Sequence, residues 1–206
     1  MKSLLLGLFI CVLYPNVVHS QSGYEIIVNL NNSNDTIAYL TYYQFDKTYI
    51  KDTCLVAKKG RFIFEGKTKL DTGIYSIVSQ QKTIYFDFFV DGQNQKLEFK
   101  NDKEPDNIQG LFVLNSPSQS NFIDYLKFVS KQNINFINYK NSVNLKDKKD
   151  SLLLVEKQKE IEKEITIYEK DFYNKNETSF IGNVVNFKLE KILENVPTAS
   201  NGRPDS

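Results

Sequence analysis

The strongest constraint on the fold is the alternation of apolar and polar residues between residues 24 and 100. Tyr24, Ile26, Val28 and Leu30 alternate with mostly polar neighbours, which is the period of a strand with one buried face. Further segments of this kind, separated by turn residues, span residues 36–43, 48–56, 61–66, 73–79, 83–90 and 96–99. Short, regularly spaced strands with no helical segment between them predict an antiparallel β-sandwich or an open barrel.

The pattern changes near residue 115 to one that is typical of helices. Asn115-Ser116-Pro117-Ser118 has the polar cap and early proline of a helix N-terminus, and apolar residues follow at helical spacing: Phe122, Leu126 and Val129. A second helix is predicted over residues 146–173, because Leu154, Ile161, Ile165, Tyr168 and Phe172 follow heptad spacing. A third begins after Thr178 or Ser179, carries Ile181, Val185, Leu189 and Ile192 on one side, and ends before Pro197.

These patterns together predict an α+β chain, with an N-terminal antiparallel β-sandwich or open barrel followed by an all-α segment. We expect a β-domain over residues 21–103 and a helical domain, itself incomplete, over residues 104–197. Residues 198–206 are expected to be a flexible tail or a truncation point, since their Asn, Gly and Pro content offers nothing that closes a domain.

The first twenty residues have the three-part layout of a secretory signal peptide. A basic start at Met1-Lys2 precedes an apolar run from Leu4 to Leu13, and Val18-His19-Ser20 supplies small residues for cleavage after Ser20. The apolar run is too short to span a membrane, which takes about 20 residues. We therefore expect an exported protein of the periplasm or cell envelope, with no stable membrane span after cleavage.

Cleavage would leave a chain with few of the side chains that catalyse reactions. The sequence has a single histidine, His19, and it would leave with the signal peptide, as would Cys11. Lys2 is the only charged residue of that segment, so the mature part carries as many basic as acidic residues. A net charge of zero gives no long-range attraction to nucleic acid or to anionic membranes.

The remaining reactive residues point to structure rather than to chemistry. Cys54 has no second cysteine for redox exchange, and we interpret it as a small apolar side chain of its strand. Without histidine, neither a serine hydrolase nor a zinc site is expected. The carboxylates that cluster in the sequence are interpreted as turn residues, with a carboxylate-based hydrolase as a remote alternative; they are Asp87, Asp91, Asp102, Glu104 and Asp106. We thus expect no enzyme activity, no cofactor and no metal.

Four tyrosines in the second and third predicted strands leave two interpretations open. Tyr39, Tyr42, Tyr43 and Tyr49 would together form a platform for a sugar or a peptide if all four faced solvent. Tyrosine is also an ordinary residue of sandwich strands, and that interpretation is favoured.

One motif gives the β-rich part a resemblance to a known family. Gly60-Arg61-Phe62-Ile63-Phe64-Glu65-Gly66 follows Asp52-Thr53 and precedes Gly73-Ile74-Tyr75. This order resembles the β-rich domain of unknown function that precedes thioredoxin-like domains in exported proteins of Gram-negative bacteria. The motif has a physical basis, because Gly60 allows a turn with positive φ, Phe62 and Phe64 point to one face, and Gly66 lets the strand end tightly. We take Gly60, Phe62, Phe64, Gly66, Gly73 and Tyr75 as structural residues.

The helical part resembles the second uncharacterised domain of the same proteins. Residues 115–126 resemble its opening, residues 178–182 its third helix, and residues 201–206 a motif in its interior. In that family a TlpA/ResA-like thioredoxin domain with Cys-x-x-Cys would follow, and no residue of this chain matches it. The resemblance implies a non-catalytic accessory module of a thioredoxin-like oxidoreductase. The alternative is an independent module that binds a glycan or a peptide.

Overall fold

The computed structural model describes residues 23–55 and 59–189. The expected signal peptide with its cleavage point at Ser20, the end of the third predicted helix and the expected tail at residues 198–206 lie outside the described residues. The first strand begins at Tyr24, directly after the first described residue.

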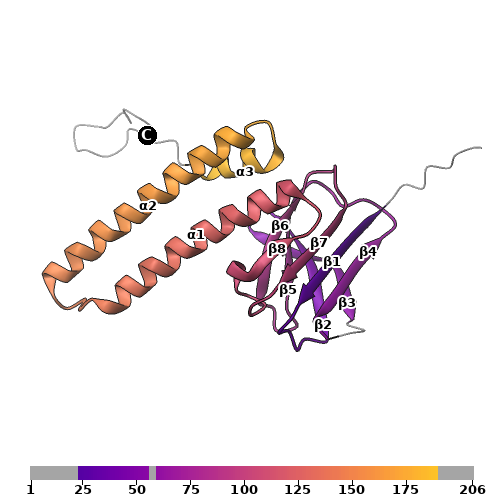
Figure 1. The fold of residues 1–206 in the computed structure, drawn as a ribbon, viewed down its shortest axis with the longest axis horizontal. Coiled ribbons are helices and arrows are strands. Elements are labelled where there is room, and N and C mark those ends of the chain that lie inside the picture. Colours follow the sequence, from indigo (N-terminus) through magenta and orange to yellow (C-terminus); the bar gives the residue numbers. More distant parts are fainter. Residues whose placement is uncertain (1–22, 56–58, 190–206) are drawn as a thin grey trace, which may run out of the picture.

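Two four-stranded sheets face each other and confirm the α+β class (Figure 1). Sheet A has the order β4-β1-β7-β8, and sheet B has the order β3-β2-β5-β6. The sheets are not closed into a barrel. The strand bounds are β1 (Tyr24–Leu30), β2 (Ile37–Gln44), β3 (Lys47–Leu55), β4 (Arg61–Gly66), β5 (Gly73–Val78), β6 (Ile84–Val90), β7 (Lys96–Asn101) and β8 (Leu111–Val113).

Sheet A differs from the sequence prediction in two ways. β1 and β7 pair in parallel, whereas the other pairings of both sheets are antiparallel. β8 was not predicted at all; it follows a short 3-10 helix (Ile108–Gly110) and pairs with β7. The sheet thus continues past the expected boundary at residue 103, and Leu111 of β8 is fully buried in the sandwich core.

The Phe-x-Phe strand lies at the centre of that core. Phe62 stands opposite Val28, and Phe64 stands opposite Ile26, so the two rings enter the space between the sheets. Gly60 has a φ of +74°, and a Cβ there would lie 2.2 Å from the carbonyl oxygen of Leu30. Both the turn geometry and the close approach therefore require glycine at this position.

The other motif residues differ in how strictly their positions require them. A Cβ on Gly66 would lie 2.3 Å from the ring of Tyr24, so a larger residue there would displace that side chain. Gly73 is not constrained in this way, because its Cβ would approach Tyr75 no closer than 3.9 Å. Tyr75 is buried in the core, and its hydroxyl donates to the carbonyl oxygen of Asp71.

Three helices follow the sandwich: α1 (Pro117–Ser142), α2 (Lys148–Asn176) and α3 (Phe180–Lys188). Their N-terminal amides are capped by Ser116, Asp147 and Ser179 respectively. Helix α1 is longer than its apolar repeat predicts, and α3 ends at Lys188. Among the described residues, the helices fall short of the combined length and apolarity that crossing a membrane requires.

A second apolar cluster fixes the helices to sheet B. Phe89 of β6 belongs to one buried cluster with residues from all three helices; they are Phe122 and Tyr125 of α1, Phe172 of α2, and Ile181 and Val185 of α3. Beyond this cluster the α1–α2 hairpin extends away from the sandwich (Figure 1). Of the predicted heptad residues of α2, Ile161 and Phe172 are buried, whereas Leu154 and Ile165 are only half-buried.

A buried polar group holds α3 against the other two helices. The carboxylate of Glu169 in α2 accepts a hydrogen bond of 2.8 Å from the hydroxyl of Tyr125 in α1. Lys188 of α3 donates to the same hydroxyl over 2.7 Å and lies 3.5 Å from Glu169. Burial and the neighbouring carboxylate raise the pKa of Tyr125, so its hydroxyl stays protonated and keeps donating.

Candidate binding surface on the outer face of sheet B

The four tyrosines do not form one platform. Tyr39 and Tyr43 point away from the core, on the side that we call the outer face of sheet B. Tyr42 points inward and packs against the core, and its ring stacks on that of Tyr49 at a centroid distance of 5.7 Å. The alternation of β2 therefore divides the set between two faces of the sheet.

A half-buried carboxylate lies on the same outer face, on the edge strand β6. Asp87 of β6 accepts hydrogen bonds from the hydroxyls of Ser76, at 2.5 Å, and of Tyr43, at 3.3 Å. Burial raises the pKa of Asp87, although both hydrogen bonds act in the opposite direction. Burial also raises the pKa of Tyr43. Over residues 23–55 and 59–189, no lysine or arginine forms an ion pair with Asp87.

An apolar groove crosses the same face toward the edge of β3. It has a volume of about 320 Å³ and is lined by Tyr39, Thr41, Thr48, Ile50, Val78, Lys82 and Ile84. The ammonium of Lys82 lies 3.4 Å from the centroid of the Tyr39 ring. The groove thus combines an apolar wall with one positive charge, a combination that suits an apolar group linked to an acceptor or an anion.

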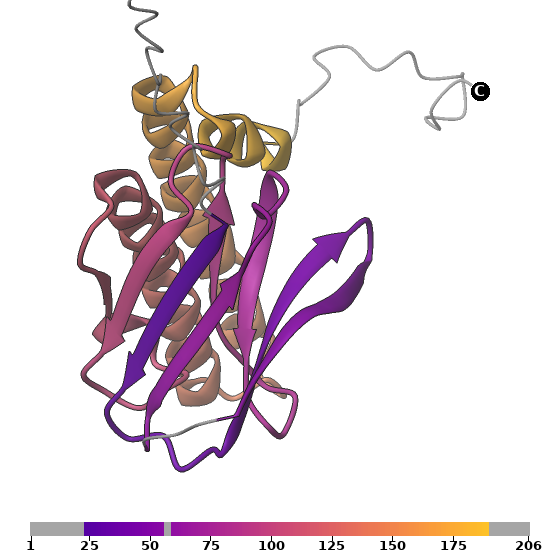
Figure 2. The same ribbon diagram turned by 90° about the vertical axis from the view of Figure 1, so that its right-hand side faces the viewer.

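The β2–β3 hairpin forms the outer border of this groove. Figure 2 shows the hairpin extending away from the rest of the sandwich. Its two-residue turn places Phe45 at a φ of +56° with 97% of its surface exposed. A bulky side chain in that backbone region is strained. Neither Phe45 nor Lys82, which also has positive φ, was singled out from the sequence, because an isolated aromatic or lysine in a turn gives no local signal.

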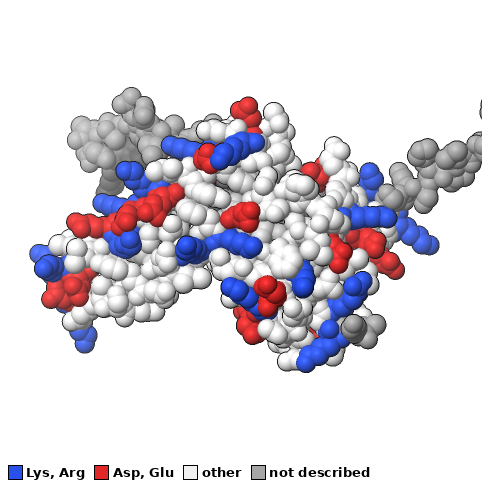
Figure 3. Space-filling model, viewed as in Figure 1, with Lys and Arg blue, Asp and Glu red and all other residues white. Residues whose placement is uncertain are grey.

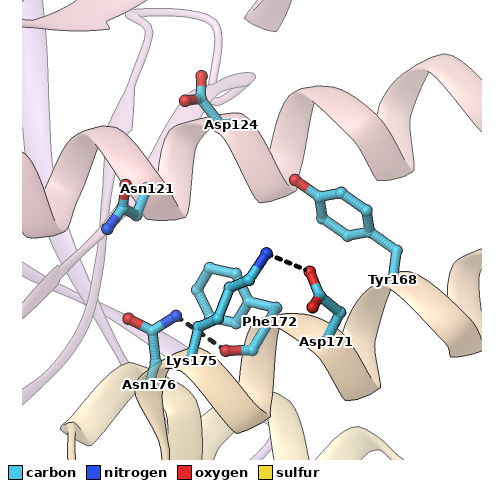
Figure 4. A pocket seen from close by; sticks show the side chains of 7 residues that line it. All are labelled: Asn121, Asp124, Tyr168, Asp171, Phe172, Lys175 and Asn176. Atoms are coloured by element: carbon cyan, nitrogen blue, oxygen red, sulfur yellow. Dashed lines mark hydrogen bonds and ion pairs between the residues drawn. The ribbon is translucent and has the colours of Figure 1, made fainter.

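A second, more polar pocket lies between α1 and α2 (Figure 4). It has a volume of about 230 Å³; Asn121 and Asp124 come from α1, and Tyr168, Asp171, Phe172, Lys175 and Asn176 come from α2. Two of its polar groups are already engaged, since Lys175 pairs with Asp171 at 2.7 Å and Asn176 donates to the carbonyl oxygen of Phe172. Burial and the charge of Asp124 raise the pKa of Tyr168.

Cys54 lies near the edge where the two sheets approach each other. Its side chain is half-buried against the core, and its sulfur accepts a hydrogen bond of 3.4 Å from the backbone amide of Ile63 in β4. Cys54 is a free cysteine, and the described residues form no disulfide. The thiol thus satisfies an amide of an edge strand.

The predicted carboxylate cluster does not assemble into a site. Asp87 lies on the sheet. Asp91 accepts a hydrogen bond from the backbone amide of Gln93 in a turn, and Glu104 accepts one from the side-chain amide of Asn32. The part of the chain that the structure describes has no group of three His, Cys, Asp or Glu residues able to hold a metal ion. Acidic and basic side chains are intermixed on the face seen in Figure 3.

The β-rich part matches one known family model. Residues 24–122 match the model of a domain of unknown function, DUF4369. The matched range runs from β1 to the buried Phe122 of α1, so the match includes β8 and the start of the first helix. Neither the curated proteins nor the solved structures contain a match to this chain.

Proposed function

We propose that this chain is a non-catalytic accessory module that positions an exported thioredoxin-like thiol–disulfide oxidoreductase domain. The proposal is supported by the resemblance of nearly all of the chain after residue 20 to the regions that precede such domains, and by the DUF4369 match over residues 24–122. In this proposal residues 1–20 direct export, cleavage follows Ser20, and the mature protein acts in the periplasm or cell envelope.

The observation that carries this proposal is a set of apolar side chains on the helical hairpin that the described residues leave exposed. Ile134 and Ile137 of α1 are 47% and 53% exposed, and Leu152 and Val155 of α2 are 59% and 49% exposed. They lie in the distal halves of the two helices, away from the cluster around Phe89. The spacing of three residues places each pair on one face of its helix, and exposed apolar patches mark contact surfaces for other proteins or domains. We take this surface, defined by these four residues, as the contact for the oxidoreductase domain.

The first experiment reads the genomic sequence beyond the codon for Ser206 and the adjacent genes for a Cys-x-x-Cys domain. Binding of that domain to residues 21–206 is then measured by isothermal titration calorimetry. Replacement of Ile137 and Leu152 by serine is expected to weaken binding, because both contribute apolar area to the contact. Leu114→Ser is the matched control, since Leu114 is equally exposed, at 54%, but lies beside the sandwich.

Two results would oppose the accessory role. One is a genome region that encodes no Cys-x-x-Cys domain in frame, after a frameshift or in a neighbouring gene. The other is a thioredoxin-like partner that binds the serine variants as tightly as it binds the unaltered chain.

The outer face of sheet B favours a second candidate function, a module that binds a glycan or a peptide. The groove beside Tyr39 and the hydroxyl groups around Asp87 supply the apolar wall and polar groups that such ligands need. A glycan and peptide array is expected to yield a saturable ligand, and Tyr39→Ala with Tyr43→Ala to abolish its binding without lowering the melting temperature. An array without any ligand would remove this candidate.

A further inference from the structure

We propose that the free edge of β3 binds an extended peptide as an additional strand, with a bulky apolar side chain in the groove of sheet B and an acidic group beside Lys82. The inference rests on the second candidate function and specifies its ligand. It commits to a peptide, because backbone hydrogen bonding along a strand edge is chemistry that a glycan does not supply.

The first argument is the open edge itself. β3 ends the order β3-β2-β5-β6, and its first five residues are all exposed. In an antiparallel pair, alternate residues direct their backbone N–H and C=O groups away from the partner strand. β3 therefore presents a row of donors and acceptors that no strand of sheet B pairs with.

The open part of this edge is limited to residues 47–51. Toward the end of β3, Asp52 accepts a hydrogen bond from the hydroxyl of Tyr24, and Cys54 accepts one from the amide of Ile63. Both contacts bring sheet A against this half of the strand. An added peptide would thus pair near the hairpin turn, where the groove opens.

Charge favours an acidic peptide over a second copy of this chain. Lys47 and Lys51 lie on the open edge, and Lys82 borders the groove. Pairing of two such edges would bring lysines of both copies together, a known device against edge-to-edge association. A peptide with a carboxylate instead meets a positive charge, since none of the described acidic residues forms an ion pair with Lys82.

The position of the groove sets how many residues should separate the apolar and the acidic side chain of the peptide. Thr48 and Ile50 of β3 line it together with Tyr39 and Val78, so the next strand would direct alternate side chains into it. An apolar residue would occupy the groove, and an acidic residue two positions away would lie on the same face. The test peptide is therefore acetyl-Thr-Val-Thr-Phe-Thr-Asp-amide.

The experiment compares this peptide with two controls, by calorimetry and by amide chemical-shift mapping on residues 21–206. One control carries N-methyl groups on alternate amides, which removes strand donors without changing any side chain. The other has lysine in place of aspartate. Each control is expected to bind about tenfold more weakly or worse, and the largest shifts are expected at residues 47–51.

The protein variant Lys82→Glu is expected to reverse the preference between the aspartate and the lysine peptide. Lys67→Glu is its matched control, because Lys67 is exposed but lies in the segment after β4, outside the groove. Reversal of charge preference is a readout that simple loss of stability would not produce.

Several outcomes would overturn the inference. They are equal binding of the N-methylated peptide, chemical-shift changes confined to other elements, and sedimentation showing that the edge pairs with a second copy. If Tyr39→Ala abolishes array binding while N-methylation has no effect, the strand-edge inference fails and the binding function stands. If no peptide or glycan binds up to about 1 mM, both fail.

Discussion

Replacement of Phe62 or Phe64 by alanine tests whether the core of the sandwich depends on the Phe-x-Phe strand. The two side chains are 0% and 1% exposed, and the residues opposite them, Val28 and Ile26, are both 0% exposed. Burial of one phenylalanine contributes about 1.5–3 kcal/mol of transfer free energy. The cavity left in a closed core adds to that, so each substitution is expected to lower the free energy of unfolding by about 3–5 kcal/mol.

Urea denaturation of residues 21–206, followed by circular dichroism, measures this change. For an m value of about 2 kcal/mol per M, a loss of about 4 kcal/mol moves the midpoint down by about 2 M. Ile63→Ala is the internal control, because Ile63 lies between the two phenylalanines but is 40% exposed on the other face. We expect that control to lose about 1 kcal/mol or less. Losses below about 1 kcal/mol at both Phe62 and Phe64 would refute the core assignment.

Three further predictions follow from buried groups and from the sheet boundary. Tyr125→Phe removes the hydroxyl that donates to Glu169 and is expected to cost about 1–3 kcal/mol in the free energy of unfolding. Burial raises the pKa of Asp87 in the folded chain. As pH rises from about 4 through that raised pKa, the free energy of unfolding of the unaltered chain is therefore expected to fall relative to that of Asp87→Asn. A difference between the two chains that stays constant with pH would contradict this. A fragment of residues 21–130 keeps β8 and the start of α1, and it is expected to melt cooperatively. A fragment of residues 21–100 lacks both and is expected not to do so. If the shorter fragment folds, the domain boundary lies near residue 103.

The strands that the sequence predicts correctly are those with a local signal. Alternation in Tyr24–Leu30 and Arg61–Gly66 reflects burial of one face, which each segment reveals without reference to its partners. Helices α2 and α3 were found for the same reason, because their apolar stripes repeat within the segment. Local periodicity was therefore sufficient for the fold class.

The missed features depend on partners far away in the sequence. β8 has only three residues, and its strand character comes from pairing with β7 rather than from its own pattern. The parallel pairing of β1 with β7 likewise joins strands about 70 residues apart, which no local pattern encodes. Helix α1 continues to Ser142 because neither glycine nor proline interrupts it, although its apolar residues no longer form one stripe after Val129.

For the candidate site, the sequence predicted which kinds of residue take part but not how they are arranged on the sheet. Tyrosines of β2 were recognised as possible contacts, but their division between two faces depends on the orientation of the strand in the sandwich. Asp87 was noted among the clustered carboxylates and interpreted as a turn residue, whereas it lies in β6 and accepts a hydrogen bond from Ser76 on the neighbouring strand. The positions of Ser76 and Lys82 carry no signal in the sequence, because their importance comes from cross-strand neighbours and from a turn. A sequence resemblance locates a domain, whereas the outer face of sheet B becomes visible only when the sheet is assembled.

The balance of charge determines how the proposed peptide contact should respond to salt. With equal numbers of basic and acidic residues in residues 21–206, no long-range field draws a ligand to β3, and recognition has to come from short-range contacts. Only one of these, the contact with the exposed ammonium of Lys82, is an ionic interaction that salt screens. Backbone hydrogen bonds and apolar contacts in the groove are not screened in this way. Raising the salt concentration should therefore shrink the difference between the aspartate and lysine peptides, while the loss caused by N-methylation persists.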